Sequence, residues 1–285
     1  MESVELAPRP AAPGAGRLLT RRMRELFRVY PKALVGDVEA VHDLRVAARR
    51  LRVALVLLAG KPDGRRARRA ERTLHDLAAA AGRGRDLDVG LEILEAFPAS
   101  ADDGNERLHR ALRASRSRAR VLSREALLDL DVASLRRDLR ACVASTRVDG
   151  AVLTERLADL GRREEETIGR ELVAARRRPD AEALHSARRS ARRLRYAAEI
   201  LDLFDGTHSD AADRWRKMQT RLGEIHDRQV LGDWLESRER RAAARGDQAQ
   251  ATAAHRSRAR VKRDAARRVR EFFAAEAAAA PDPLA

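Results

Sequence analysis

The 285-residue chain contains a single cysteine and few aromatic residues. With only Cys142 it cannot form an internal disulfide, which suits a reducing compartment. Aromatic residues make up 3% of the chain, too few for the stacking platforms that hold single-stranded nucleic acid. No apolar run approaches the roughly 20 residues that span a bilayer, and residues 1–16 lack the apolar stretch of a secretory signal. We therefore expect a cytoplasmic protein that makes no membrane contact.

Signals for strands, metals and catalysis are also missing. There are few β-branched runs and no hairpin dipeptide between alternating segments. The chain has no Gly-x-x-x-x-Gly-Lys-(Ser/Thr) loop, no His-Glu-x-x-His and no Gly-x-Ser-x-Gly. His42-Asp43 and His226-Asp227 are sequence neighbours, whose side chains diverge on a helix and make poor metal pairs. We expect a protein that is not an enzyme, with no catalytic residue, metal site or cofactor.

What the chain has in abundance is positive charge. Lys and Arg number 59 against 44 Asp and Glu, which gives a formal net charge of +15. Such an excess indicates a polyanionic partner: nucleic acid, an anionic membrane surface or a phosphate polymer. Most of the excess is arginine, whose planar fork of donors suits phosphate oxygens. A compositional bias of the source could explain the number of arginines, but not their repeated spacing.

That spacing is clearest in one segment, His42 to Arg52, which recurs as His185 to Arg195 at an offset of 143 residues. On a helix the basic residues of each copy share one side, beside a face of Leu and Ala that suits burial. The recurring basic residues are His42, Arg45, Arg49, Arg50, Arg52, His185, Arg188, Arg192, Arg193 and Arg195.

Two interpretations of this basic stripe compete. A charged helix face is usually only solvated, and a helix histidine is often merely packed. However, like charges at i, i+4 destabilise a helix, so stacked arginines without acidic partners need an external counter-charge. Successive phosphates could supply it through bidentate contacts with the guanidinium groups. We therefore predict that these ten residues bind a phosphate polymer.

Further basic residues could widen the site, and for these a solvated role is equally good. Three groups share helix faces or recur at i, i+4 in both halves. They are Arg65, Arg68, Arg72 and His75; Arg214, Lys217 and Arg221, with His226 near by in sequence; and Arg116 and Arg120 with their mates Arg256 and Arg260.

The pattern predicts an all-α fold with two homologous helical bundles, which arose by internal duplication and are joined end to end. Besides the offset of 143, the turn at Gly82 recurs at Gly223, and Arg116 to Val121 recurs verbatim as Arg256 to Val261. We expect a tail over 1–16, bundles over 17–149 and 150–278, and a tail over 279–285. Proline is expected to stop the first helix at 31, and Gly223 to separate helices at 208–222 and 226–244. Asp86 and Asp227 are expected to be N-cap or first-turn carboxylates that the helix dipole favours, or else to orient arginines.

The paired His-x-x-Arg-x-x-x-Arg-Arg-x-Arg segments, each followed by a Gly…(Arg/His)-Asp turn and a Val, resemble the conserved histidine α-helical domain, or CHAD domain. The resemblance covers about residues 17–275 and implies two pseudo-symmetric four-helix-type bundles, with the motif helices lining a basic central cleft. It also implies binding of inorganic polyphosphate and association with polyphosphate granules. The first copy departs from the family pattern with Arg85 in the place of His226 and Val53 in the place of Tyr196. The alternating Glu-x-Glu-x-Lys strand of a triphosphate-tunnel domain, which many relatives carry, is absent, so we expect a stand-alone CHAD protein.

Two other functions stay open: a basic helical protein that binds nucleic acid, or an accessory subunit of an enzyme acting on polyphosphate or triphosphates. Scarce aromatic residues and the lack of a helix-turn-helix or zinc-finger signature disfavour nucleic acid, which we expect only as a weak competitor. Near a polyanion the pKa of His42 and His185 should rise, so binding should strengthen mildly below about pH 7.

Overall fold

The computed structural model describes residues 14–97, 102–178, 180–206 and 209–279, and within these ranges it contains ten helices and no strand. The predicted all-α class is confirmed. The helices are α1 (Ala15–Leu34), α2 (Val38–Leu58), α3 (Arg65–Ala80), α4 (Arg83–Ala96), α5 (Asp103–Leu128), α6 (Val132–Ala144), α7 (Gly150–Arg177), α8 (Ala181–Asp205), α9 (Asp210–Ala243) and α10 (Gln248–Ala279). None of these helices is long and apolar enough to cross a bilayer.

Local chemistry sets most helix ends. The Asp37 carboxylate accepts a hydrogen bond from the amide of Ala40 at the start of α2, and Gly206 ends α8 in the left-handed conformation. Two expected boundaries were wrong. Helix α1 continues through Pro31 for three more residues, and α9 passes through Gly223 without a break.

The predicted boundaries of the two tails lie close to the observed ends of the first and last helices. Helix α1 begins at Ala15 and α10 ends at Ala279, while residues 1–13 and 280–285 lie outside the described ranges.

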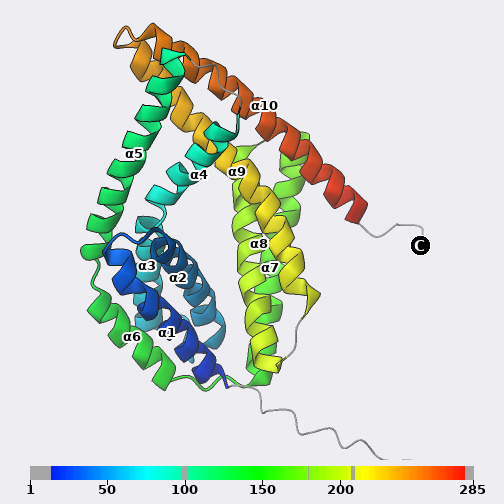
Figure 1. Ribbon diagram of the computed structural model, residues 1–285. Coiled ribbons are helices and arrows are strands. Elements are labelled where there is room, and N and C mark those ends of the chain that lie inside the picture. Colours follow the sequence, from blue (N-terminus) through cyan, green and yellow to red (C-terminus); the bar gives the residue numbers. More distant parts are fainter. Residues whose placement is uncertain (1–13, 98–101, 179, 207–208, 280–285) are drawn as a thin grey trace, which may run out of the picture.

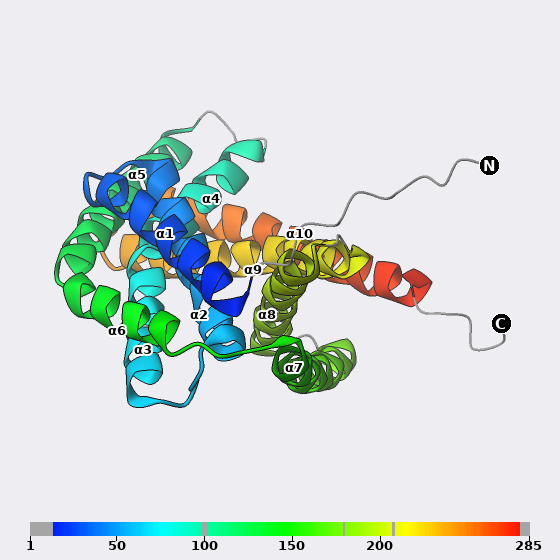
Figure 2. The ribbon, with the colours of Figure 1, turned by 90° about the horizontal axis from the view of Figure 1, so that it is seen from below.

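The largest apolar core joins the two halves of the chain. In Figures 1 and 2, α1, α2, α3 and α6 lie together on one side, with α7 and α8 on the other. Leu44 and Leu51 of α2 are fully buried and belong to the same cluster of contacts as Leu194 and Ile200 of α8. The predicted apolar face of each motif helix therefore packs inward, which leaves the arginines of both helices on the adjoining faces.

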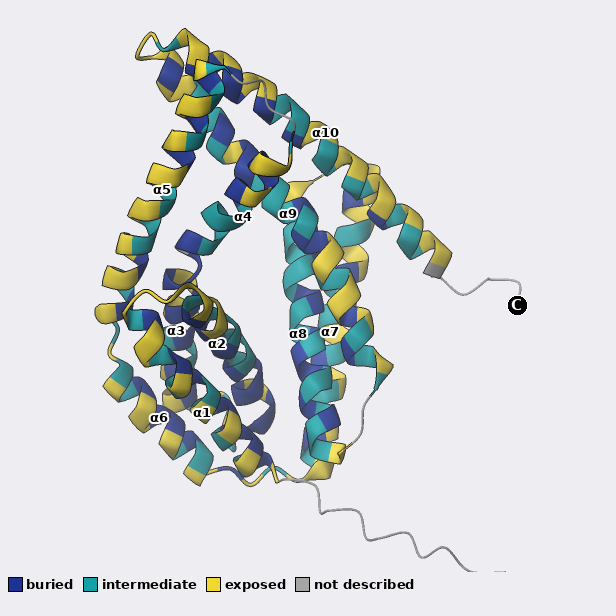
Figure 3. Cartoon of the chain, in the orientation of Figure 1, coloured by how far each residue is buried: buried dark blue, intermediate teal, exposed yellow. Residues whose placement is uncertain are grey.

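A second, smaller core lies away from the first and forms what we call the arm: α4, the first half of α5, the last turns of α9 and the start of α10. Leu91, Leu112, Leu235 and Val261 are among its buried residues. In Figure 1 these helices converge at the upper left, and Figure 3 shows that the outer faces of α5 and α10 are largely exposed. The arm thus joins the fourth and fifth helices of the chain to its last two.

The order of helices agrees with an internal duplication, because the motif helices α2 and α8 each follow one helix, α1 and α7. The single helix α9 stands where the first half has α3 and α4. Descent by duplication stays a prediction.

Candidate functional site: an arginine-lined cleft

A cleft of about 570 Å³ lies between the motif helices α2 and α8, with α3, the start of α4 and the middle of α9 completing its wall. Among the described residues its wall holds seven arginines, three histidines and one carboxylate. They are Arg45, Arg49, Arg52, Arg188, Arg189, Arg192, Arg193, His75, His185, His226 and Asp86. Ser186, Ala78, Ala79 and Gly82 fill the remaining wall. Most of the arginines come from the two segments whose spacing repeats.

Three arginines at the rim of the cleft are paired with carboxylates of α3, α7 and α8. Arg52 binds Glu71 at 2.9 Å, and Arg189 binds Glu182 at 3.2 Å. The Nε of Arg193 donates to Glu164 at 2.6 Å. These three side chains are held in place by protein partners, so they add less unmatched charge to the cleft.

The inner arginines, Arg49, Arg188 and Arg192, have no such partner. Among the described residues none of the three makes a hydrogen bond or an ion pair, and the Nε of Arg188 is buried without an acceptor. Burial, with Arg192 and Arg45 close by, lowers the pKa of Arg49 to about 8. Burial and the neighbouring Arg188 lower the pKa of Arg192 to about 10. Several like charges are therefore crowded at low exposure, and an anion in the cleft would stabilise them.

Two glycines allow the inner wall to form. A Cβ atom at Gly82 would lie 3.4 Å from the Cζ of Arg45, and one at Gly223 would lie 3.3 Å from the Nε of Arg188. Each guanidinium group therefore packs directly over a glycine backbone. The two contacts involve residues at matching positions of the two halves, and the Nε of Arg45, like that of Arg188, is buried without an acceptor.

Asp86 and Asp227 lie beside these two arginines. Asp86 accepts a hydrogen bond from Arg45, with 3.2 Å between Nη1 and Oδ1. The pKa of the partly buried Asp227 is raised by burial, against the opposing effect of Arg188. Asp86 is in the first turn of α4, as predicted for a carboxylate at a helix start, whereas Asp227 is inside α9, where the prediction of a helix start was wrong. Orientation of an arginine, the alternative, describes Asp86.

The histidines form one close pair. The Nδ1 atoms of His185 and His226 lie 3.1 Å apart, which requires one ring to donate and the other to accept. Burial lowers the pKa of His226 to about 3, with Arg188 and His185 adding to the effect. The pKa of His185 is lowered too, by burial and then by Arg189. Both rings are therefore neutral in the empty cleft at pH 7.

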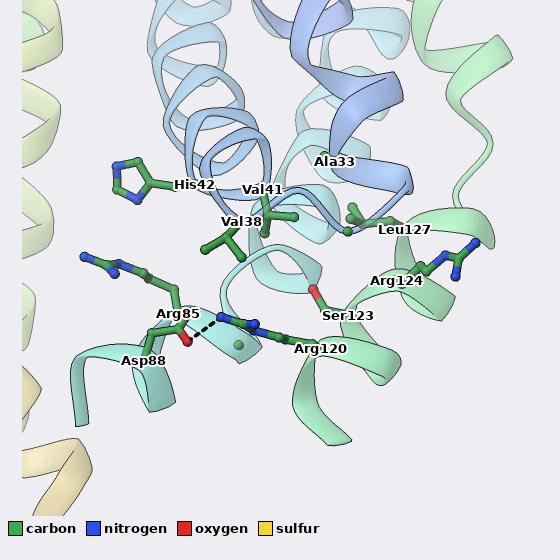
Figure 4. Close-up of a pocket in the computed structure, with 12 residues that line it drawn as sticks. Ala33, Val38, Val41, His42, Arg85, Asp88, Arg120, Ser123, Arg124 and Leu127 are labelled. Carbon is green, nitrogen blue, oxygen red and sulfur yellow. Dashed lines mark hydrogen bonds and ion pairs between the residues drawn. The ribbon is translucent and has the colours of Figure 1, made fainter. Parts of the chain in front are cut away.

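Three of the ten predicted motif residues lie outside the cleft wall. Arg50 donates to both oxygens of Glu199 at 3.0 and 3.2 Å, and Arg195 donates to the same carboxylate at 3.0 Å. Glu199 thus joins α2 to α8, and both arginines share its single negative charge. His42 is exposed and lines a small neighbouring hollow with Arg85, beside the Arg120–Asp88 ion pair (Figure 4).

The additional basic residues also divide into some that line the cleft and others that lie elsewhere. His75 and His226 line the cleft. Arg116 and Arg120 bind Asp88, Arg256 binds Asp102, and Arg214, Lys217 and Arg221 line a separate open hollow beside Trp215. Arg65, Arg68 and Arg72 are exposed on α3, and Arg260 is partly buried on α10. Sequence reasoning missed Arg189 and Ser186. Its stripe followed i, i+3 and i+7, whereas the wall presented by α8 is wider than that.

The fold and the cleft define an all-α protein with an arginine-lined cleft between two motif helices. The sequence pattern of the CHAD domain matches residues 17–236, and the chain belongs to the CHAD domain family. The crystal structure of the CHAD domain from the plant Ricinus communis is similar, with a TM-score of 0.63 at 20% sequence identity. That similarity covers 97% of this chain and 95% of the plant chain. A search among curated proteins gave no match.

Proposed function

We propose that the cleft binds inorganic polyphosphate without carrying out a reaction on it. The observation that carries the proposal is the set of inner arginines, which lie partly buried and unpaired where an anion could reach them. A linear chain of phosphates presents evenly repeated oxygens, and each guanidinium group can hold them with two donors. Inorganic polyphosphate, the ligand that the resemblance to the CHAD family implies, is a chain of this kind.

The same cleft is less suited to nucleic acid. Its volume is in the range of sites that hold small or thin ligands, and no Phe, Tyr or Trp is among its lining residues. Tyr196 lies close, but it is buried and contacts Arg50 and Arg195 with its ring. Without an exposed aromatic surface the cleft cannot stack bases.

The scarcity of carboxylates among the described residues of the cleft wall favours binding over catalysis. Asp86 is the one carboxylate among the described residues of the wall, and Arg45 already binds it. No group of three or more potential metal ligands occurs among the described residues. If phosphate were nevertheless released from polyphosphate by the purified protein, and the release disappeared with Arg49→Ala, the proposal would have to change to an enzymatic one.

The first test is a titration of long-chain polyphosphate against the native protein and an Arg49→Ala/Arg192→Ala variant. Charge-assisted hydrogen bonds contribute about 1.5–3 kcal/mol each, so losing both arginines should weaken binding by about 100-fold or more. Because two crowded like charges are removed, the free energy of unfolding should not fall. A loss of binding would then not be due to misfolding.

The matched control is Arg137→Ala/Arg140→Ala, which removes the same charge from the exposed face of α6. It should change affinity by no more than about threefold, the effect of net charge alone. Duplex DNA at equal phosphate concentration, at two salt concentrations, serves as competitor. Equal losses in the two variants, or ready displacement by DNA, would show a diffuse basic surface instead of a site.

We also propose that this binding brings the protein to polyphosphate granules in the cytoplasm of cells that store the polymer. A fluorescent fusion should mark the granules, and the Arg49→Ala/Arg192→Ala variant should be diffuse. Granule labelling that survives the double substitution would assign recruitment to another surface.

A further inference from the structure

Two groups of arginines lie across a groove on the arm, between α5 and the end of α9. The open groove has a volume of about 350 Å³ and is lined by Arg107 and Arg110 of α5 and by Arg238 and Arg245 at the end of α9. Arg118 and Arg241 lie near enough to Arg238 to lower its pKa. We call this hollow, together with its six arginines, the arm groove.

Carboxylates neutralise little of this charge. Asp103 and Asp247 both bind Arg107. The partner of Arg245 is the amide of Gln250, and that of Arg118 is the hydroxyl of Ser115.

The remaining three arginines of the arm groove, Arg110, Arg238 and Arg241, make no hydrogen bond or ion pair with any described residue. Burial lowers the pKa of Arg238, and the neighbouring Arg245 lowers it further. The arm groove therefore shares with the cleft the presence of arginines without acidic partners, of which Arg238 is partly buried and Arg110 and Arg241 are exposed.

The acidic residues of the same stretch of α9 are used on another face. Glu236 and Glu239 both bind Arg258 of α10, and Glu239 also contacts His255. Positive and negative side chains are thus segregated around this helix, instead of alternating as on an ordinary solvated surface. Arg238 is further positioned by the Trp234 ring, with 5.6 Å between its Cζ and the ring centroid.

Helix α9 also fixes how far the arm groove lies from the cleft. His226 lines the cleft, and Arg238 follows it by twelve residues in the same unbroken helix, which is about 18 Å of helix length. Arg238 and Arg241 are turned about 60–120° around the helix from His226. A flexible linear polyanion can follow such a path, whereas a small anion cannot reach both places.

We infer that the arm groove is a second anion site, occupied by the part of a long polyphosphate chain that extends beyond the cleft. The inference depends on the proposed function for the identity of the polymer. The groove is open, so a free short chain would be held weakly there. Once one end of a polymer occupies the cleft, the remainder is at high effective concentration over the arm, and the second contact adds affinity through multivalency.

The test compares tripolyphosphate with long-chain polyphosphate on the intact protein. The variant Arg238→Gln/Arg241→Gln should bind tripolyphosphate as the native protein does, and long-chain polyphosphate about tenfold more weakly. The control Arg137→Gln/Arg140→Gln removes two exposed arginines that make no ion pair, at the same spacing on α6, and should leave both affinities near native. Far-ultraviolet circular dichroism and denaturant unfolding verify that each variant is folded.

The outcomes separate the two proposals. Native long-chain affinity in Arg238→Gln/Arg241→Gln, or an equal loss in the control, overturns the second site and leaves the cleft untouched. If Arg49→Ala/Arg192→Ala retains tripolyphosphate binding, the proposed function of the cleft fails instead. If the arm variant loses affinity for duplex DNA but not for polyphosphate, the arm groove is a nucleic-acid surface and the inference is wrong.

Discussion

At the scale of single residues, the position of carboxylates decides which arginines are available. Arg49 and Arg50 are sequence neighbours, yet Arg50 is bound by both oxygens of Glu199 while Arg49 faces the cleft unpaired. The same division separates Arg195, which binds Glu199, from Arg192. A row of identical side chains thus contains structural and ligand-accessible members.

The histidine pair leads to a prediction about pH. In the empty cleft His226 is neutral because burial, Arg188, His185, Arg45 and Arg192 lower its pKa to about 3. A bound polyanion would offset the arginines and raise that pKa, so binding would take up protons. We expect affinity for tripolyphosphate to increase several-fold between about pH 7.5 and 5.5, measured by calorimetry in buffers of different ionisation enthalpy.

Without ligand, a fall in pH is expected to lower the stability of the protein, whereas it raises the affinity for the ligand. The pKa of His226 is lower in the folded protein than in the unfolded chain, so the unfolded chain binds more protons below about pH 6.5. The free energy of unfolding should therefore fall as the pH drops below that value. A His185→Gln/His226→Gln variant should flatten both profiles, whereas His255→Gln, on the exposed side of the arm, should preserve them. An unchanged affinity profile in the double variant would assign the pH response of binding to the phosphates, and an unchanged stability profile would assign that of unfolding to other groups of the chain.

Much of the cleft could be predicted from sequence at this scale, because the repeated spacing selected seven arginines and histidines of the motif that line it. The exceptions have physical reasons. Arg195 and Glu199 are four residues apart, so their pairing was open to prediction. The contact between Arg50 and Glu199 spans 149 residues and depends on the packing of α2 against α8, which no local pattern encodes.

At the scale of elements, α9 shows how a glycine can be misinterpreted. The sequence around Gly223 suggested a turn, because the matching Gly82 does separate α3 from α4. In α9 the glycine instead makes room for the guanidinium group of Arg188 and the helix continues. The prediction for Pro31 was wrong in a similar way. Pro31 lies near the end of α1, and the helix continues past it for three more residues.

Substitution of Gly223 by alanine should separate stability from binding. Alanine is favoured over glycine inside a helix by about 1 kcal/mol, so the variant should be as stable as the native protein or more stable. Its Cβ would lie 3.3 Å from the Nε of Arg188 and displace that guanidinium group. We expect polyphosphate affinity to fall by about 3- to 10-fold, equivalent to about 1 kcal/mol, with denaturant unfolding measured in parallel.

Gly232→Ala provides the control within the same helix, since a Cβ there meets no atom within 4 Å. It should show the gain in stability and native affinity. Native affinity in Gly223→Ala as well would mean that Arg188 contributes little to binding, or adapts without cost.

At the scale of the whole molecule, the two halves of the chain are interdependent. Leu160 and Ile168 of α7 are buried in the same cluster as Leu26 and Leu58 of the first half, and Leu231 of α9 packs in the arm with Leu91 of α4. The sequence predicted a division at residues 149–150, and α7 does begin there. Repeated patterns indicate where a unit recurs, but not whether each unit buries its own apolar face.

We therefore expect residues 17–149, expressed alone, to lack a cooperative unfolding transition. Removal of α7 and α8 would expose the side of α2 that faces Leu194 and Ile200, and removal of α9 and α10 would expose the arm core. Mixing the two halves should restore helicity and a sharp transition, measured by circular dichroism during denaturation. A cooperative transition for the isolated first half would show that the shared core is dispensable.

The unbroken course of α9 has a last consequence. Because α9 is a continuous helix that carries a cleft residue and an arm residue at a fixed separation, it sets the minimum length of a polymer that can contact both sites. Chains shorter than that separation would engage one site and leave quickly, whereas chains just long enough to bridge it would be retained. Given occupancy of both sites, the protein would respond to a threshold in polymer length and could discriminate freshly made long polymer from its breakdown products.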